Sequence, residues 1–240
     1  LDRLYEGAAA IDIDIGMDRV ALAGALYRTI TANDMVDGVH IRLMVTRGIK
    51  RTPNQDPRYT IGTATIVIVA EWKEPNPEVK KKGLRLFTSA IRTTPPDMFD
   101  MRINSHSRLP LITALIQALK AGADEALMLD PHGFVASCNA TNFFIVRRGE
   151  VWTSTGRFSF NGITRGNVVR LAEANGIPML QKDFTLAEVA TADEAFVTGT
   201  FGGVTPVSAV DGRVIGGGPG GPMTQRLDAL YRELLAAEGA

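Results

Sequence analysis

The stretch "NGITRGNVVRLAEANGI", residues 161–177, joins a glycine turn to an amphipathic segment. Its apolar residues recur at helical spacing, which predicts a helix that starts at Ile163 and ends at Gly176. The turn places backbone amides and the Thr164 hydroxyl at the start of this helix. Free N–H groups and the positive end of the helix dipole favour a phosphate there. An ordinary helix cap explains the same residues.

A second glycine turn lies later in the same half of the chain. In "TGTFGG", residues 198–203, two hydroxyls flank Gly199, which permits a close backbone approach at the end of a predicted strand. Ordinary turn chemistry would explain this motif alone, but the two motifs together favour a ligand that carries phosphate. The sequence holds no zinc pattern, no Walker motif, no G-x-S-x-G elbow and no G-x-G-x-x-G after a strand.

The composition indicates a globular chain with no net charge to create a strong electrostatic field. Of its 240 residues 45% are hydrophobic and 22% charged, enough to bury a proper core. Lys+Arg and Asp+Glu balance at 26 each, so we expect no nucleic-acid or anionic-membrane partner. No apolar run reaches transmembrane length. A single cysteine, Cys138, rules out an internal disulfide and fits a reducing, cytoplasmic setting.

The pattern along the chain predicts an α+β fold in two parts. Residues 59–72 read as a long, buried, β-branched strand, and residues 83–96 as a strand. The stretch "KEPNPEVKKKG", residues 73–83, is rich in proline and charge and is the best linker candidate. We therefore predict a small domain over residues 1–77 and a larger one over 78–240. Further strands are predicted over 38–48 and within 125–154 and 194–218. Helices are predicted over 1–10, 18–33, 110–123, 163–176, 185–192 and 222–237.

Four stretches together resemble the class IV aminotransferases, the pyridoxal phosphate family of branched-chain and D-amino-acid aminotransferases. These are "AGADEALMLDPHGFVASCNATNFFIV", "NGITRGNVVRLAEANGI", "ADEAFVTGTFGGVTPV" and "GPMTQRL", in the family's order and spacing. The resemblance implies the two-domain fold of this family. The opening "LDRL" resembles the family's "H-x-x-R-L" helix, which implies a truncated small domain that lacks a segment before Leu1.

The resemblance also implies how a cofactor phosphate would be held. Arg3 resembles the arginine that grips the phosphate of pyridoxal phosphate. Ile163 and Thr164 resemble one half of the phosphate site, and Gly199 and Thr200 the other half. This agrees with the interpretation of the two glycine turns from their own chemistry.

Two positions depart from the family pattern. The Schiff-base lysine lies in "I-K-S-x-x-x-L", and "INSHSRL" places Asn104 there. The glutamate that pairs with the pyridine nitrogen lies in "G-x-x-x-E-x-x-x-x-N", and "GFVASCNATN" places Ser137 there. An amide can neither bond covalently to the cofactor nor move a proton, and a hydroxyl holds a pyridinium charge less well than a carboxylate does. We therefore expect that any pyridoxal phosphate is held noncovalently.

Candidate catalytic and substrate-binding residues follow from these segments. His106 lies in the same segment as Asn104, between a strand and a helix, and Lys50 follows a strand of the first half; either is a candidate substitute base. Arg42, Arg47 and Arg108 are candidates for binding a substrate carboxylate, and surface arginines at strand ends explain the first two equally well.

Three hypotheses remain open. The first is a class IV aminotransferase-like enzyme that acts on a small amino or keto acid, without ordinary lysine-dependent transamination. The second is an enzyme of lyase, racemase or hydrolase type that reuses the pocket without pyridoxal phosphate. The third is an inactive binding or regulatory protein. The resemblance implies a homodimer in each case.

Overall fold

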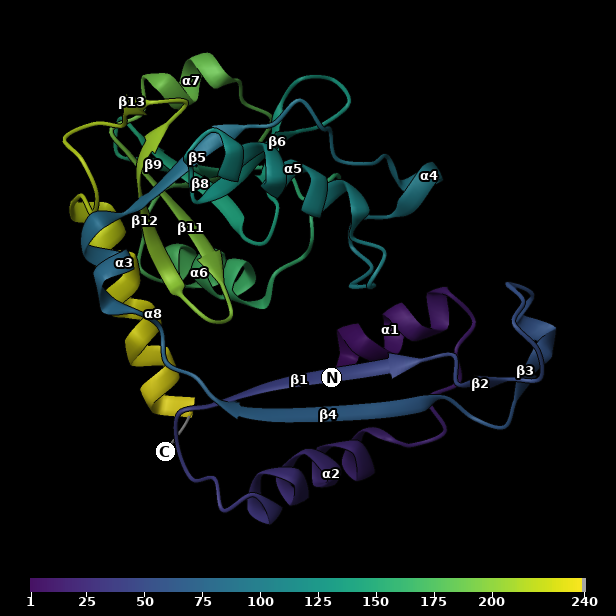
Figure 1. Ribbon diagram of the computed structural model, residues 1–240. Coiled ribbons are helices and arrows are strands. Elements are labelled where there is room, and N and C mark those ends of the chain that lie inside the picture. The colour runs from purple at the N-terminus through teal and green to yellow at the C-terminus, as the bar shows by residue number, and fades with distance from the viewer. Residues whose placement is uncertain (239–240) are drawn as a thin grey trace. The chain divides into compact units, whose positions relative to one another are not determined.

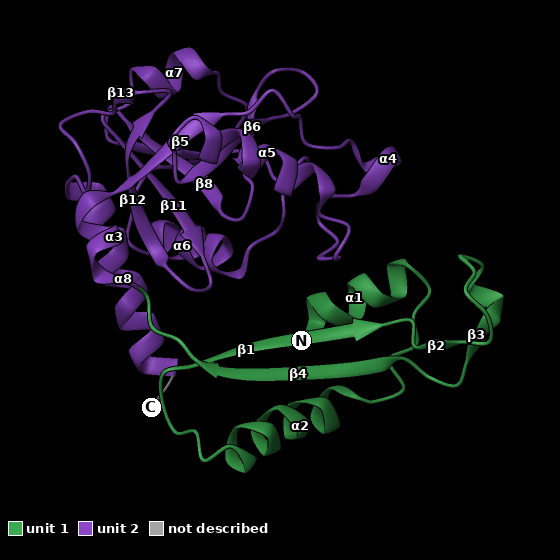
Figure 2. Cartoon of the chain, viewed as in Figure 1, with its two compact units in different colours: residues 1–75 green, residues 76–240 purple. Residues whose placement is uncertain are grey.

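The computed structural model describes residues 1–238, and the chain divides into two compact units (Figure 2). Unit 1 is Leu1–Pro75, and unit 2 begins at Asn76. The division falls inside the stretch 73–83 that the sequence marks as a linker. Of the four stretches that carry the family resemblance, all lie in unit 2, whereas "LDRL" lies in unit 1.

Unit 1 is built on an antiparallel hairpin with two helices (Figure 1). The longer helix begins after Asp18, whose side chain accepts the Ala21 backbone N–H at 2.7 Å and so caps the first turn. The helices are α1 (Asp2–Ala10) and α2 (Arg19–Ala32), the hairpin is β1 (Val39–Thr46) and β4 (Thr65–Trp72), and a small pair is β2 (Ile49–Lys50) with β3 (Thr60–Ile61).

The prediction of one long buried strand over residues 59–72 is wrong. Gly62, with φ of +72°, separates β3 from β4. Within β4 the exposure alternates, because successive side chains of a strand point to opposite faces. Val67 and Val69 are 37% and 44% exposed, whereas Ile66 and Ile68 are partly covered. The β-branched run therefore belongs to a hairpin with one open face.

Unit 2 holds a nine-stranded mixed sheet, in the order β10-β9-β8-β11-β12-β5-β6-β7, with β13 paired to β12 (Figure 1). The strands are β5 (Leu84–Thr88), β6 (Glu125–Leu129), β7 (Val135–Cys138), β8 (Asn142–Arg147), β9 (Glu150–Thr153), β10 (Met179–Gln181), β11 (Glu194–Gly199), β12 (Gly203–Val210) and β13 (Arg213–Val214). The helices are α3 (Pro77–Lys82), α4 (Pro96–Phe99), α5 (Leu109–Lys120), α6 (Ile163–Ala174), α7 (Leu186–Ala190) and α8 (Pro222–Glu238).

The core of unit 2 follows the alternation of its strands. One face of the sheet carries side chains such as Phe143 and Ile145, which form a common core with residues of β5 to β12. The intervening side chains face α6 and α8, and there the rings of Phe144 and Phe196 stack at 4.8 Å between centroids. The sheet thereby fixes α6 and α8 against the β8–β11–β12 strands.

Two further predictions about chain segments are wrong in part. The strand predicted over residues 83–96 ends at Thr88, because the Asp211 carboxylate accepts both the Thr88 N–H and its hydroxyl at 2.6 Å. The predicted linker 73–83 contains a short helix, α3. Pro77 occupies its first position, and the Asn76 side chain accepts the Glu78 N–H at 3.0 Å.

Candidate functional site

The first turn of α6 presents backbone amides that no side chain caps. Gly162 is the N-cap residue, with φ −64° and ψ 136°, and it makes no side-chain cap hydrogen bond. Thr164 follows in the first turn and is only 3% exposed. Helix amides without an internal partner bind an anion well because the helix dipole adds to their hydrogen bonds. This turn can therefore hold a phosphate.

The turn between β11 and β12 forms a second backbone-rich surface. Gly199 ends β11 and pairs with Gly203, whose φ of +61° suits glycine. Between them, the Thr200 side chain is exposed, and Gly202 O accepts the Thr205 hydroxyl at 3.1 Å. Hereafter the first turn of α6 (Ile163 and Thr164) and the β11–β12 turn (199–203) together are called the anion cup.

Residues at the start of β8 bring both parts of the anion cup together. The Asn142 Nδ2 donates to Phe160 O at 2.8 Å, and a Cβ added at Gly162 would lie 2.3 Å from Asn142 Oδ1. Asn142 also pairs with Thr198 across the sheet. On the other side, a Cβ added at Gly199 would lie 3.2 Å from the Thr141 Cγ2. The predicted residues Ile163, Thr164, Gly199 and Thr200 thus lie around one point of unit 2.

Ser137 lies next to the same point but is engaged with the backbone. It is 5% exposed, and its hydroxyl donates to Thr141 O at 2.7 Å. The Asn142 Nδ2 lies 3.4 Å from the Ser137 Oγ. The hydroxyl hydrogen is therefore committed to a carbonyl, and what Ser137 can offer a ligand is a neutral acceptor oxygen.

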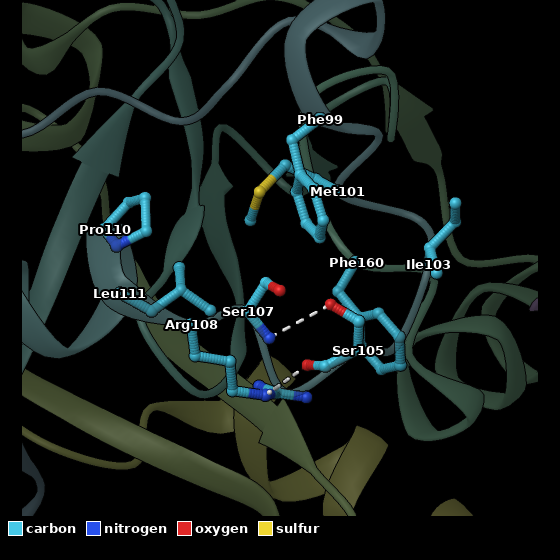
Figure 3. A pocket seen from close by; sticks show the side chains of 9 residues that line it. All are labelled: Phe99, Met101, Ile103, Ser105, Ser107, Arg108, Pro110, Leu111 and Phe160. Atoms are coloured by element: carbon cyan, nitrogen blue, oxygen red, sulfur yellow. Dashed lines mark hydrogen bonds between the residues drawn. The ribbon is translucent and has the colours of Figure 1, made fainter. Parts of the chain in front are cut away.

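The segment that carries Asn104 is largely exposed and held by short-range hydrogen bonds, of which Figure 3 shows the one between Arg108 and Ser105. A guanidinium N–H of Arg108 donates to Asn104 Oδ1, and the Arg108 Nε donates to Ser105 O at 3.1 Å. The backbone N–H of Arg108 donates to His106 O at 2.8 Å, and the His106 side chain is exposed. The structure thus places these three predicted residues in one turn.

A small cavity lies between this segment and Phe160, which precedes the anion cup in the chain. It measures about 30 Å³, which is the volume of about one water molecule in the liquid. Phe160, two residues before the Gly162 cap, forms part of its wall (Figure 3). The cavity is lined by Phe99, Met101, Ile103, Ser105, Ser107, Arg108, Pro110, Leu111 and Phe160.

The loop before α6 is anchored by a buried arginine. Arg165 is 8% exposed, and its guanidinium donates to Ser154 O at 2.6 Å and to Gln181 Oε1 at 2.8 Å. Burial lowers the pKa of the Arg165 guanidinium, because the charged form loses hydration. Arg165 points away from the first-turn amides toward this loop, so its role in the site is structural.

Behind the β7–β8 turn lies a buried carboxyl group. Glu125 accepts the Ala140 N–H at 3.0 Å and the Thr141 hydroxyl at 3.0 Å. Burial raises the pKa of Glu125 above its ordinary value, and the hydrogen bonds from Thr141 and Ala140 offset part of that rise. Glu125 therefore supports the turn from which Ser137, Thr141 and Asn142 reach the anion cup.

The other predicted residues lie in unit 1. Arg3 is on α1, where burial lowers the pKa of its guanidinium. Arg42 is an exposed residue of β1, opposite Val69. Arg47 donates to the carbonyls of Asp12, at 2.7 Å, and Ile11, and so closes the end of α1. Lys50 donates to Asn54 O. The ligand-binding roles of these four residues stay predictions.

Sequence reasoning missed two residues at the anion cup. Tyr231 of α8 is 6% exposed, and its hydroxyl lies 3.4 Å from the Thr164 Oγ1. Asn142 is the last residue of the quoted "G-x-x-x-E-x-x-x-x-N" pattern, and this position could have identified it as a candidate site residue. Tyr231 sits at an ordinary core spacing of the last helix, so the sequence held no sign of its contact.

The described part of the chain, residues 1–238, contains no cluster of three or more His, Cys, Asp or Glu side chains that could hold a metal ion. Within the same residues, no helix is both long and apolar enough to cross a membrane.

Comparison with known proteins identifies the family. The family model for amino-transferase class IV matches residues 1–210. Branched-chain-amino-acid aminotransferase-like protein 2 of Arabidopsis thaliana is 38% identical over the whole chain, which spans 43% of that relative. A putative branched-chain-amino-acid aminotransferase of Methanocaldococcus jannaschii is 36% identical over 98% of the chain and 80% of the relative.

Among solved structures, the branched-chain aminotransferase from the archaeon Thermoproteus uzoniensis, solved with norvaline, superposes with a TM-score of 0.88 and 32% identity. The match covers 97% of this chain and 76% of that one. The chain thus spans less than half the length of the Arabidopsis relatives and about three quarters of the solved structure. The matched residues and the mixed sheet of unit 2 lead to one conclusion: the chain belongs to the class IV aminotransferase family.

Proposed function

We propose that the chain is a class IV aminotransferase-like enzyme that holds pyridoxal phosphate by its phosphate, without a covalent bond, and acts on a small amino or keto acid. The observation that carries the proposal is the anion cup, which lies in the same unit as Asn104. The cup offers uncapped amides of α6 and the glycine turn of β11–β12. Asn104, at the position of the family's lysine, cannot form a covalent bond to the cofactor.

The phosphate end of the site fits the cofactor. A Cβ at Gly162 would come within 2.3 Å of Asn142, so glycine is needed where the chain enters the cup. The first-turn amides and the β11–β12 backbone can donate to phosphate oxygens. When bound, pyridoxal phosphate supplies an aldehyde and an electron-withdrawing ring. The phosphate contacts fix its depth and orientation.

The ring-nitrogen end favours an uncharged ring. Ser137 donates its hydroxyl hydrogen to Thr141 O, so it presents no charge and no free hydrogen. A carboxylate would stabilise a protonated ring nitrogen, and a neutral oxygen does so far less. The residues of this end therefore hold the ring without strengthening its electron withdrawal.

His106 is the proposed proton-transferring group. It lies two residues after Asn104 in an exposed turn, and imidazole is the side chain most often used in general acid–base catalysis. Arg108, which donates to Asn104 and Ser105, orients that turn and offers a cation for a substrate carboxylate. A positioned general base typically accelerates proton transfer by roughly 10²- to 10⁴-fold. Because Asn104 stands at the lysine position, turnover is expected to be slower by a factor of this size.

The test uses an absorbance spectrum after addition of pyridoxal phosphate, with and without borohydride, followed by intact-mass analysis. The expected result is bound cofactor that denaturation releases, with no added mass after reduction. Asn104→Lys is the positive control, because a lysine at that position is expected to give a covalent adduct.

Two outcomes contradict the proposal. An adduct in the unchanged chain, mapped to Lys50, would show covalent attachment elsewhere. Absence of pyridoxal phosphate binding would favour an enzyme that reuses the pocket without the cofactor, or a regulatory protein. The expectation of a homodimer is tested separately by light scattering of the purified chain.

A further inference from the structure

We infer that Tyr231 is a positioning residue that holds the two parts of the anion cup in register, an inference that rests on the proposed function. Tyr231 belongs to α8 and lies 28 residues after Gly203, the last residue of the cup along the chain. It contacts both parts of the cup through different atoms of one side chain. Tyr231 therefore links the first turn of α6 directly to the β11–β12 turn.

The first contact is made by the hydroxyl. The Tyr231 OH lies 3.4 Å from the Thr164 Oγ1, at the long end of the hydrogen-bond range, and either oxygen can donate. Thr164 is buried in the first turn of α6, so its hydroxyl has little access to water. The contact ties α8 to the first turn of α6, the turn whose amides form one part of the cup.

The second contact is made by the ring. A Cβ added at Gly203 would lie 3.2 Å from the Tyr231 Cε1 and 3.3 Å from its Cδ1. Gly203 begins β12 and pairs with Gly199, so the ring lies against the base of the β11–β12 turn. Because packed side chains yield little, this contact limits how far the turn can move relative to α6.

The helix that carries Tyr231 is itself fixed at two levels. The Glu194 carboxylate, at the start of β11, accepts the N–H groups of Met223 and Thr224 at 2.9 and 2.8 Å. One turn before Tyr231, Asp228 accepts the Lys80 Nζ at 2.8 Å. A side chain on a helix anchored in this way can position the residues that it touches.

The experiment measures binding of pyridoxal phosphate and of inorganic phosphate by calorimetry, together with the ³¹P NMR shift of the bound phosphate. The variants are Tyr231→Phe, which keeps the ring, and Tyr231→Ala, which removes it. Leu234→Ala is the matched control, because Leu234 is partly buried in the same core of α8 but has no contact with the cup among those described. Thermal unfolding without ligand reports the packing cost of each change.

For Tyr231→Phe we expect the dissociation constant to rise about 2- to 5-fold and the ³¹P shift of the bound phosphate to change. For Tyr231→Ala we expect the dissociation constant to rise more than about tenfold. Leu234→Ala should lower the unfolding midpoint but leave the dissociation constant within about twofold. If Tyr231→Ala does not fold, a cycle of Tyr231→Phe with Thr164→Val decides, because the two hydroxyl deletions should be non-additive in binding.

The inference is overturned, with the proposed function intact, if the unchanged chain binds both probes and the Tyr231 variants behave like Leu234→Ala. Additive effects in the Tyr231–Thr164 cycle would overturn it as well. If the unchanged chain binds neither probe, the proposed function fails and this inference fails with it.

Discussion

Gly162→Ala is expected to lower the free energy of unfolding by about 2–4 kcal/mol and to weaken phosphate binding. The backbone itself accepts alanine, because φ of −64° and ψ of 136° are available to any residue. The whole cost arises from the added methyl group, which would lie 2.3 Å from Asn142 Oδ1 and 3.6 Å from the Arg165 Cβ. The first distance is far below van der Waals contact, so Asn142 must move.

The magnitude follows from what Asn142 gives up. Its side chain is 5% exposed and donates to Phe160 O at 2.8 Å. A shift that clears the methyl group breaks this hydrogen bond and takes the buried Asn142 amide away from its acceptor, at about 1–3 kcal/mol. Crowding of the neighbouring core adds about 1 kcal/mol or more. Exchange of the amide oxygen and nitrogen of Asn142 gives no relief, because the two groups have similar size.

Urea unfolding monitored by tryptophan fluorescence measures this effect, and calorimetry with inorganic phosphate measures binding. Gly166→Ala is the matched control on the same helix. Nothing lies within 4 Å of the added methyl group there, so it should stabilise by about 0.5–1 kcal/mol through helix propensity. Asn142→Ala removes the obstacle, so the double variant with Gly162→Ala should be no less stable than Asn142→Ala alone.

Two results would refute this reasoning. One is a Gly162→Ala variant within about 0.5 kcal/mol of the unchanged chain, which lies inside the range of neutral surface changes. The other is a double variant whose loss equals the sum of the two single losses, because contacting residues should be coupled.

Three further predictions follow from buried groups of unit 2. The Cys138 thiol is fully buried and burial raises its pKa, so a thiol reagent should label it only as fast as the chain unfolds; fast labelling of the native chain would contradict this burial. Burial raises the pKa of Glu125 above its ordinary 4.5, so the native state keeps a proton that the unfolded chain has released. The contribution of Glu125 to the free energy of unfolding therefore falls as the pH rises above about 4.5. Glu125→Gln should flatten that fall in urea midpoints measured between pH 4.5 and 8, and an unchanged slope would contradict the assignment. Glu194→Gln should lower the free energy of unfolding by about 1–3 kcal/mol, because the new amide NH2 faces the N–H of Met223 or Thr224 and cannot accept it. Urea unfolding measures the change. A variant as stable as the unchanged chain would contradict the role of Glu194 in capping α8.

Sequence patterns were sufficient for the helix that starts at Ile163 and for the strands within residues 125–154, where the turn sequences "DPHG" (130–133) and "RRGE" (147–150) separate them. Periodicity and turn residues are local signals. The same reasoning failed for residues 59–72. A β-branched run looks the same in a buried strand and in a hairpin, and its exposure depends on what packs against it. It failed again at residues 89–96. There the backbone N–H groups of Ser89 and Thr93 still donate to β6, but the distant Gln117 side chain accepts the Ser89 hydroxyl and the Ala90 N–H, and no regular strand forms.

The candidate site shows the same limit. The two glycine turns could be found because glycine has a local conformational reason to be there. Their meeting around Asn142 depends on the register of β8 with β11, which brings Thr198 opposite Asn142 over a sequence separation that no local pattern spans. Tyr231 was missed for this reason: its contact with Thr164 joins two helices that pack only in the folded chain.

The contrast between the two ends of the site has a consequence for how such a protein can diverge. The hydrogen bonds described for Asn104, Ser105, His106 and Arg108 all join residues within four positions, whereas the anion cup depends on contacts between distant strands and helices. An exposed side chain of the first segment, such as Asn104 or His106, can therefore be exchanged with little disturbance of the core and at small cost in folding. Substitutions at the cup are filtered by folding itself, so ligand binding should outlast the ancestral reaction in a lineage under relaxed selection.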